Sequence, residues 1–284
     1  MKKRIMSKKS KIINSIVLLV ILVLGYFSFV QPNQKSTKTV TVGIMSANKQ
    51  DDAIWSQVAK TAKSKYGITL KFKRFTDYSQ PNKALQNGDV DLNAFQHYAF
   101  LNAYNSKNDS NIKAIGKTAI SPIHLYSQSY KSVQDFQDGD TIVVPNDASN
   151  ESRALYVLKN AGLIKLSSGS NLKTTKDITA NPKNLKIKEI SADQTARTLG
   201  DAKGVVVNGN FATAAGLSSK DAIFTEPLNK DSKSWVNIIA ARGKDQNKKI
   251  YKDVVKSYQT PEVKKIIKQQ YGDSELPAWD RDFN

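Results

Sequence analysis

The sequence predicts an α/β fold with mostly parallel sheets. Apolar runs with strand periodicity alternate with segments of helical periodicity along most of the chain. Glycines follow several of the helical segments, where helices commonly end. Alternation of this kind is typical of strands joined by helical crossovers, which build parallel sheets. The sequence shows no internal repeat.

The first predicted elements follow a short polar stretch that ends near residue 38. Residues 40–44 alternate apolar and polar side chains, which predicts a strand. Residues 55–66 repeat apolar positions at three- and four-residue spacing, which predicts an amphipathic helix that Gly67 ends. Residues 68–72 alternate again as a second strand. A short helix is expected at residues 82–87.

The remaining elements continue the alternation. In chain order they are a strand at 141–144, a helix at 150–160, a strand at 204–207, a helix that ends at Gly216, a strand at 235–240, and helices at 247–258 and 261–271. Polar residues follow two of the strands, at 145–153 and 208–210. Parallel sheets bind ligands at the carboxyl ends of their strands, so these two segments are candidate binding loops.

Composition excludes several kinds of chemistry. The chain has no cysteine, so disulfides, zinc–thiolate sites and thiol nucleophiles are ruled out. Its two histidines, His97 and His124, show no metal-ligand spacing, and neither a phosphate-binding glycine loop nor a nucleophile elbow occurs. We therefore expect a binding protein with no cofactor, metal or catalytic residue, and not an enzyme. A serine triad, whose members meet only in space, stays a minor alternative.

The chain is strongly basic, with a formal net charge of +18. Six positive charges lie within the first eleven residues and are assigned to targeting, which leaves about +12 on the rest. The remaining lysines are scattered and do not interleave with aromatic residues. We expect a solvated basic surface suited to an anionic cell envelope, and no nucleic-acid partner. Binding to an anionic polymer stays the alternative.

Residues 12–30 form a stretch of nineteen residues without a charge. As a helix this stretch would span roughly 28 Å, close to the thickness of a bilayer core. The positive residues before it predict a cytoplasmic N-terminus and an extracytoplasmic remainder at the cell membrane. It ends in bulky residues, Tyr26 to Val30, and lacks the small-residue site of a cleaved signal peptide. We expect an uncleaved signal anchor followed by a polar tether, with cleavage as the alternative.

Arg153 is the charge that points most directly to a ligand. It falls in the first turn of the helix predicted at 150–160, where the helix dipole disfavours a cation. A bound carboxylate would compensate, because a guanidinium pairs with it bidentately. Asn150 lies three residues earlier and either shares this face or caps the helix. The alternative is that Arg153 pairs with a nearby Asp or Glu and that Asn150 is only a cap.

Aromatic residues cluster between Asn93 and Phe100. Phe95, His97, Tyr98 and Phe100 are suited to wall a pocket for an apolar or thioether side chain, since sulfur contacts aromatic edges favourably. The alternative for this run is an ordinary helix that places its phenylalanines in the core.

Two further groups of candidates follow predicted strands. Phe75, Asp77 and Tyr78 form a second aromatic–polar cluster after the strand at 68–72. Asn208 and Asn210 flank a glycine after a buried strand. An amide there can accept from an ammonium or donate to a carboxylate, and its alternative role is helix capping.

Six motifs occur in the order known from one family. The motifs are FTDYSQPNKAL (75–85), GDVDLNAFQHYAFL (88–101), VVPNDASNESRAL (143–155), AGLIKL (161–166), NPKNLKIKEI (181–190) and VVVNGNFATAAGL (205–217). Together they resemble the methionine-binding lipoprotein family, the substrate-binding components of methionine ABC importers. The resemblance covers about residues 39–271 and rests on the whole series, since no single motif would carry it.

The resemblance implies an α/β, two-lobed periplasmic-binding-protein fold, similar to type II, with the ligand in the cleft between the lobes. The ligand implied is L-methionine or a close derivative, delivered to the permease and ATPase subunits of an ABC importer. The chain would cross between the lobes near 121–127 and return near 224–230. The boundaries implied are a signal anchor and tether at 1–38, lobe 1 at 39–122 plus 229–284, and lobe 2 at 123–228.

The resemblance also implies roles for single residues. Tyr78 and His97 would flank the side chain of the ligand. Asn150 and Arg153 would hold its carboxylate, and Asn208 would contact its backbone atoms.

Weaker matches to the family's site are Phe75, Phe95 and Asn210, whereas Arg197 matches a family arginine that we interpret as structural. Two departures stand out. The lipid-bearing cysteine is missing, so residues 12–30 would replace the lipid as anchor. Phe100 stands where tyrosine is usual, which leaves methionine dipeptides, methionine sulfoxide or another amino acid open as ligands. The alternative function is an adhesion or binding protein of the same fold with another amino-acid, dipeptide or anionic partner.

Overall fold

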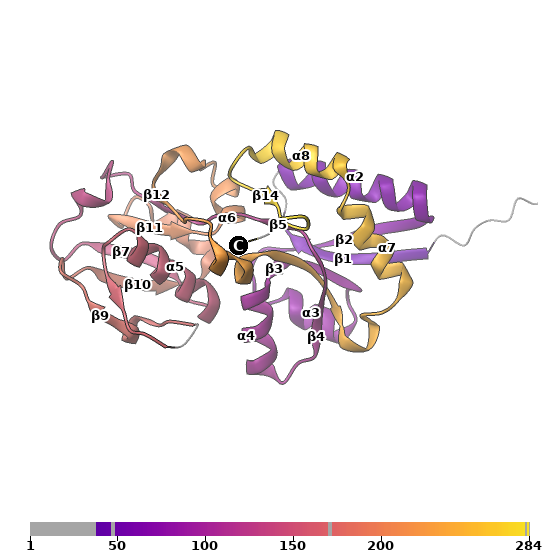
Figure 1. The fold of residues 1–284 in the computed structure, drawn as a ribbon, viewed down its shortest axis with the longest axis horizontal. Helices are drawn as coiled ribbons and strands as arrows, with labels where there is room; N and C mark the ends of the chain where they lie inside the picture. The colour runs from indigo at the N-terminus through magenta and orange to yellow at the C-terminus, as the bar shows by residue number, and fades with distance from the viewer. Residues whose placement is uncertain (1–37, 47–48, 170–171, 282, 284) are drawn as a thin grey trace, which may run out of the picture. The chain divides into compact units, whose positions relative to one another are not determined.

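The computed structural model describes residues 38–46, 49–169, 172–281 and 283. The chain from Thr39 to Asn284 is one compact unit, and its described strands build two five-stranded sheets (Figure 1). The predicted signal anchor and its tether lie outside the described residues. Within those residues, no helix is both long and apolar enough to cross a membrane.

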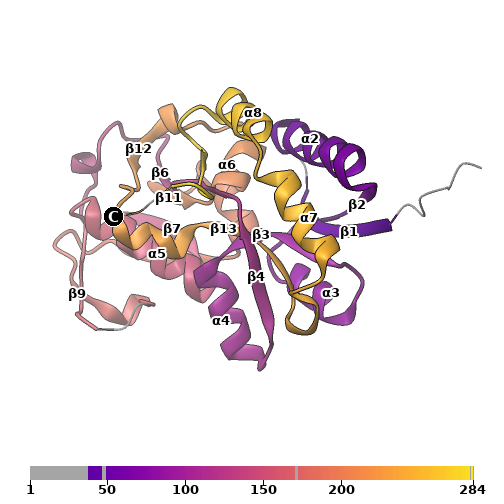
Figure 2. The same ribbon diagram turned by 45° about the vertical axis from the view of Figure 1, so that its right-hand side comes forward.

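The first sheet defines lobe 1. Its strands are β1 (Lys38–Met45), β2 (Ile68–Phe75), β3 (Leu92–His97), β4 (Ile112–Lys117) and β13 (Asn237–Arg242), in the order β2-β1-β3-β13-β4. Its helices are α2 (Lys49–Tyr66), α3 (Pro81–Asn87), α4 (Tyr98–Asn108), α7 (Lys249–Tyr258) and α8 (Pro261–Tyr271). The helices α2, α7 and α8 cover one face of the sheet, and α3 and α4 pack on the other (Figure 2).

Side chains of lobe 1 alternate between two cores across this sheet. In β13, Ile239 and Ala241 belong to the cluster under α2, α7 and α8, whereas Ile238 and Ala240 belong to the cluster under α3 and α4. Successive side chains of a strand point to opposite faces, so all four are fully buried. Burial on both faces explains the uninterrupted apolar sequence of this strand.

The second sheet defines lobe 2. Its strands are β6 (His124–Tyr126), β7 (Thr141–Pro145), β10 (Lys186–Ile190), β11 (Gly204–Val207) and β12 (Ala222–Thr225), in the order β10-β7-β11-β6-β12. The helices α5 (Ala148–Asn160) and α6 (Gly209–Ala214) follow β7 and β11. Two short pairs complete the described strands: β5 (Ala119–Ile120) with β14 (Leu276–Pro277), and β8 (Lys165–Leu166) with β9 (Ile178–Ala180).

Both sheets are mixed: most of their strands run in one direction, as the prediction of mostly parallel sheets expects, and one strand of each sheet is reversed. The strand β13 lies antiparallel to both β3 and β4, and β6 lies antiparallel to both β11 and β12. Each of these two strands is the first strand after the chain changes lobe, and it enters the interior of a sheet against the direction of its neighbours. The pairs β1–β3, β7–β10 and β7–β11 are parallel, as expected for strands joined by helices.

Two crossing segments join the lobes. The first follows β5, whose Ala119 packs in the core of lobe 1, and leads through Ser121 to β6. The second follows β12 and begins at Glu226. The two segments hydrogen-bond to each other, because Ile123 accepts from the backbone N–H of Glu226 at 3.0 Å and donates to the Glu226 carboxylate at 3.2 Å. The lobe boundaries given by the sequence stay a prediction.

Every element predicted from periodicity occurs, with one shift that matters for the cleft. The aromatic run at 93–100, for which an ordinary helix was the alternative, is divided: β3 ends at His97 and α4 begins at Tyr98. The helix predicted at 150–160 begins two residues earlier, at Ala148, and Asp147 caps it by accepting from the backbone N–H of Asn150. Arg153 therefore lies beyond the first turn, and the dipole argument for a ligand there is wrong.

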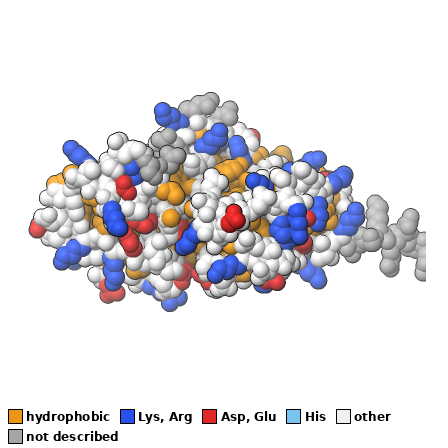
Figure 3. Space-filling model, turned by 90° about the horizontal axis from the view of Figure 1, so that it is seen from below, with side chains coloured by type: hydrophobic (Ala, Val, Ile, Leu, Met, Phe, Trp, Pro, Cys, Tyr) orange, Lys and Arg blue, Asp and Glu red, His pale blue; other side chains and the backbone are white. Residues whose placement is uncertain are grey.

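The surface in Figure 3 shows how charge is spread over one face of the molecule. Lysine and arginine side chains lie among aspartate and glutamate side chains, and hydrophobic side chains reach the surface near the middle. The charge on this face is mixed in sign.

Candidate functional site

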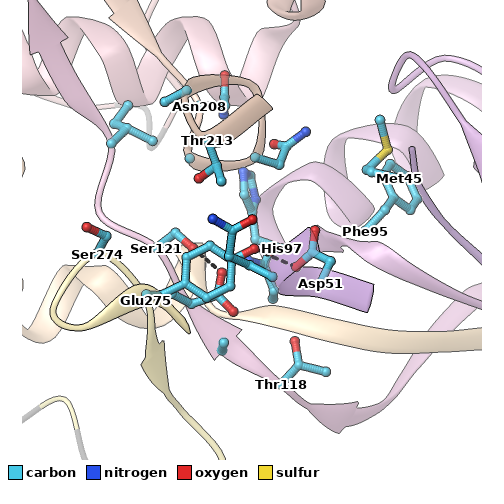
Figure 4. A pocket seen from close by; sticks show the side chains of 18 of the residues that line it. Met45, Asp51, Phe95, His97, Thr118, Ser121, Asn208, Thr213, Ser274 and Glu275 are labelled. Atoms are coloured by element: carbon cyan, nitrogen blue, oxygen red, sulfur yellow. Dashed lines mark hydrogen bonds between the residues drawn. The ribbon is translucent and has the colours of Figure 1, made fainter. Parts of the chain in front are cut away.

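A cavity of about 260 Å³ is lined by residues of both lobes. Figure 4 shows Phe95 and His97 of lobe 1 and Asn208 of lobe 2 around it. These residues come from the carboxyl ends of β3 and β11, where ligand sites of α/β sheets form. Seven of the eight residues predicted for the site line this cavity: Tyr78, Phe95, His97, Asn150, Arg153, Asn208 and Asn210.

An aromatic group forms the apolar part of the wall. Tyr78, which follows β2, packs against Phe95 and Phe100 with ring centroids 6.0 and 5.8 Å apart, and the two phenylalanines meet edge to face at 5.6 Å. Phe211 of α6 packs on Tyr78 at 4.9 Å. The Tyr78 hydroxyl donates to the side chain of Asn210, which joins lobe 1 to lobe 2. Burial raises the pKa of Tyr78, so its hydroxyl stays protonated.

His97 forms a second connection between the lobes. Its Nδ1 accepts from the backbone N–H of Phe100 at 3.0 Å, so in the neutral ring the proton sits on Nε2, which donates to Oδ1 of Asn150 at 3.2 Å. Burial and the nearby Arg153 guanidinium lower the pKa of His97 to about 3. His97 is therefore a neutral hydrogen-bond donor at ordinary pH.

Asn150 and Asn208 form the polar wall of lobe 2. Asn150 donates to Asp147 and accepts from both His97 and Asn208, so its side chain is committed to protein partners. Asn208 donates to Asn150 at 2.8 Å but does not cap α6, although it stands at the capping position. Its Oδ1 is buried and has no hydrogen-bond partner among the described residues. An unpaired buried acceptor on a cavity wall is suited to a ligand N–H donor.

Arg153 is buried in an ion pair with Glu226. Its Nε donates to Glu226 Oε1 at 2.8 Å and its Nη2 to Oε2 at 2.5 Å, and the two side chains are only 4% and 8% exposed. Nη2 also donates to the backbone oxygen of Ser121 at 2.9 Å. Arg153 thus contacts both crossing segments. The alternative given from the sequence, that Arg153 pairs with an acidic residue, is confirmed, and that residue is Glu226.

These contacts leave one nitrogen of the guanidinium, Nη1, for the cleft. Within the described part of the chain, Nη1 of Arg153 makes no hydrogen bond, and Arg153 lines the cavity. The indole of Trp235 lies 5.2 Å from the guanidinium carbon and 5.1 Å from the His97 ring. Glu226 and Trp235 were not identified from the sequence. Glu226 falls in the predicted return crossing, but only folding brings it to Arg153.

Two other predicted residues lie elsewhere. Phe75 is buried in the core of lobe 1 beside α3, with Leu85 and Val90, and is not on the cavity wall. Arg197 is exposed on a short 3₁₀ segment, away from the cavity. In the part of the chain that the structure describes, no group of His, Asp and Glu is arranged to hold a metal ion.

The cavity wall also carries two carboxyl groups. Glu275, next to β14, accepts from the Ser121 hydroxyl at 2.8 Å (Figure 4). Asp51 accepts from the Tyr271 hydroxyl at 2.7 Å. Burial, and then the charge of Asp51, raise the pKa of Glu275 to about 8, so Glu275 keeps its proton near neutral pH.

Two α/β lobes, joined by two crossing segments around a cleft with one aromatic and one polar wall, define a substrate-binding protein of the periplasmic type. The chain belongs to the NlpA lipoprotein family, whose model matches residues 40–279. The predicted family and two-lobed fold are thereby confirmed.

Similar proteins are named for binding or transport. A probable D-methionine-binding lipoprotein MetQ of Haemophilus influenzae is 40% identical over 84% of this chain and 87% of its own length. A nutrient-binding protein of Burkholderia cenocepacia, solved bound to methionine, is 43% identical with a TM-score of 0.80, over 84% of this chain and 99% of that one. The substrate-binding protein of a methionine transporter from Streptococcus pneumoniae is 45% identical with a TM-score of 0.80, over 85% and 96% of the two chains.

Proposed function

We propose that this protein binds L-methionine or a close methionine derivative and delivers it to an ABC importer. The observation that carries the proposal is the presence, in one cleft, of the Arg153 Nη1 group and the Asn208 Oδ1 atom, neither of which has a hydrogen-bond partner among the described residues. An α-amino acid carries a carboxylate for the first group and an ammonium for the second. The names of the similar proteins support the same ligand.

In this proposal the aromatic wall holds the thioether. Tyr78, Phe95 and Phe100 present ring faces and edges, and sulfur is attracted to aromatic rings by up to about 1.5 kcal/mol. His97 completes this wall as a neutral ring. Asn150 acts through its neighbours, because it positions both His97 and Asn208 and keeps no group for the ligand.

The partners in this proposal are the permease and ATPase subunits of an importer and the membrane itself. The chain has no cysteine to carry a lipid, so we propose that residues 12–30 act as an uncleaved anchor and keep the binding unit on the extracytoplasmic face. Mature protein beginning after Val30 would contradict this part and leave a secreted binding protein.

The ligand is tested by native mass spectrometry of the purified full-length chain, followed by calorimetry. The panel is L- and D-methionine, methionine sulfoxide, methionine dipeptides, leucine and glutamine. We expect binding of methionine or one of its derivatives with at least tenfold preference over leucine, since the aromatic wall favours sulfur. Failure of every methionine compound to bind would overturn the proposal, and tighter binding of another amino acid would change the ligand.

A further inference from the structure

The guanidinium in the cleft is already paired with a carboxylate before any ligand enters. Arg153 and Glu226 form a buried pair of opposite charges, with both side chains at most 8% exposed. Glu226 is held on three sides, by Nε and Nη2 of Arg153 and by the backbone N–H of Ile123. Because buried charges interact strongly in a low-dielectric site, the net charge of this pair matters for any ionic ligand beside it.

The other titratable groups near the pair add no positive charge. Burial lowers the pKa of His97 to about 3 and that of His124 to about 4, so both rings are neutral. Asp147 is hydrogen-bonded behind Asn150 at the start of α5. Asp51 and Glu275 also line the cavity; Asp51 adds negative charge, whereas Glu275 keeps its proton near neutral pH. Arg153 is therefore the single cation among the described residues of the cavity wall.

We infer that Glu226 is a specificity-determining residue that restricts this cleft to ligands of zero net charge that contain an ammonium as well as a carboxylate. The inference rests on the proposed function, because it concerns how the proposed amino-acid site rejects related anions. Glu226 cancels the charge of Arg153, so the carboxylate of a ligand must arrive with its own cation. A zwitterion meets this condition, and an analogue that lacks the amino group does not.

The hydrogen bonds around Arg153 distinguish an effect of the Glu226 charge on the ligand from a purely structural role in positioning Arg153. Glu226 occupies the Nε–Nη2 edge of the guanidinium, Ser121 takes the second hydrogen of Nη2, and Nη1 is the nitrogen left to the ligand. Ser121 and Glu226 lie at the starts of the two crossing segments, so they fix the guanidinium relative to both lobes. Removing the charge of Glu226 while keeping its shape leaves Arg153 in place without its buried counter-ion.

The experiment compares two ligands on the full-length chain in detergent micelles. L-methionine is the zwitterion, and 4-(methylthio)butanoate is the same skeleton without the amino group. Calorimetry and competition measure the ratio of their dissociation constants in the parent and in Glu226→Gln. We expect the preference for methionine to shrink by on the order of tenfold or more in Glu226→Gln. Glu262→Gln, which removes an exposed carboxylate on α8, is expected to keep the ratio of the parent.

Each other outcome has a defined meaning. If Glu226→Gln weakens both ligands equally, Glu226 has only a structural role and the inference is wrong, while the proposed function stands. If the parent binds another amino acid, the same comparison is made with that amino acid and its desamino analogue. If the parent binds only a methionine dipeptide, the comparison is made with that dipeptide and its desamino analogue; if it binds neither a methionine compound nor another amino acid, both proposals are overturned. Should Glu226→Gln fail to fold, Glu226→Asp keeps the charge and must keep the parent ratio; a ratio shifted tenfold would refute the inference.

Discussion

The two lobes present different chemistry to the cleft that they share. Lobe 1 lines it with the rings of Tyr78 and Phe95, whereas lobe 2 lines it with Arg153 and Asn208. Rings hold an apolar side chain with little directional demand, while a guanidinium and an amide fix the orientation of a charged end. The difference indicates that a ligand with one apolar and one zwitterionic end bridges the lobes, so each lobe supplies part of the binding free energy.

The largest effect is expected on the polar side, from Arg153→Ala. Loss of the guanidinium should reduce the free energy of methionine binding by about 2–4 kcal/mol, measured by calorimetry. The variant also leaves Glu226 buried without its partner, so the free energy of unfolding should fall by about 3–5 kcal/mol, measured by denaturant titration. The control is Arg197→Ala at an exposed position, expected to change stability by less than about 0.5 kcal/mol. An Arg153→Ala variant that binds as tightly as the parent would rule out the carboxylate role.

Asn208→Ala tests the other polar contact of lobe 2. The amide oxygen is proposed to accept from the ligand ammonium, and a hydrogen bond to a charged group contributes about 1.5–3 kcal/mol. We expect the free energy of methionine binding to weaken by that amount, while removal of a buried unpaired acceptor limits the loss of stability. Asn102→Ala, at an exposed position on α4, is the matched control. Unchanged affinity in Asn208→Ala would assign the ammonium to another acceptor.

Tyr78→Phe tests the aromatic side and the connection between the lobes together. The ring is kept and the hydrogen bond to Asn210 is lost, so we expect affinity to fall by about 0.5–1.5 kcal/mol. Stopped-flow measurement should place most of the change in the dissociation rate, because the lost bond holds the lobes closed around the ligand. Tyr104→Phe removes a hydroxyl bonded to Gln86 within lobe 1, and it is expected to leave ligand affinity unchanged. Equal losses in the two variants would contradict a role in closure.

The contrast between the lobes was only partly predictable from the sequence. Periodicity located β1, β7 and β11, because strands buried on one or both faces leave a clear apolar pattern. It did not find β6 or β10; β6 has only three residues, and β10 carries the charged sequence KIKEI. The candidate residues predicted on loops after strands do line the cleft, because the carboxyl ends of the strands meet there.

The rest depended on contacts between residues far apart in the chain. Phe75 was a cleft candidate by motif but is buried behind α3, since strand and helix packing decides which side of the sheet its ring faces. The Arg153–Glu226 pair joins residues 73 positions apart, and no local sequence pattern predicts it. The same holds for Glu275, which reaches Ser121 across 154 positions.

That last contact leads to a different kind of prediction, a dependence of stability on pH. In the unfolded chain the Glu275 carboxyl has a pKa near 4.5, and in the folded protein burial and the charge of Asp51 raise its pKa to about 8. Between these values the folded state keeps a proton that the unfolded state has released, so the free energy of unfolding falls as pH rises through this window. The contribution is fully present below pH 4.5. Glu275→Gln cannot titrate, so its stability, followed by denaturant titration from pH 5 to pH 8, should change less steeply than that of the parent. Glu262→Gln, an exposed carboxyl of the same lobe, should keep the parent slope, and a parent slope retained in Glu275→Gln would assign the pH dependence to another group.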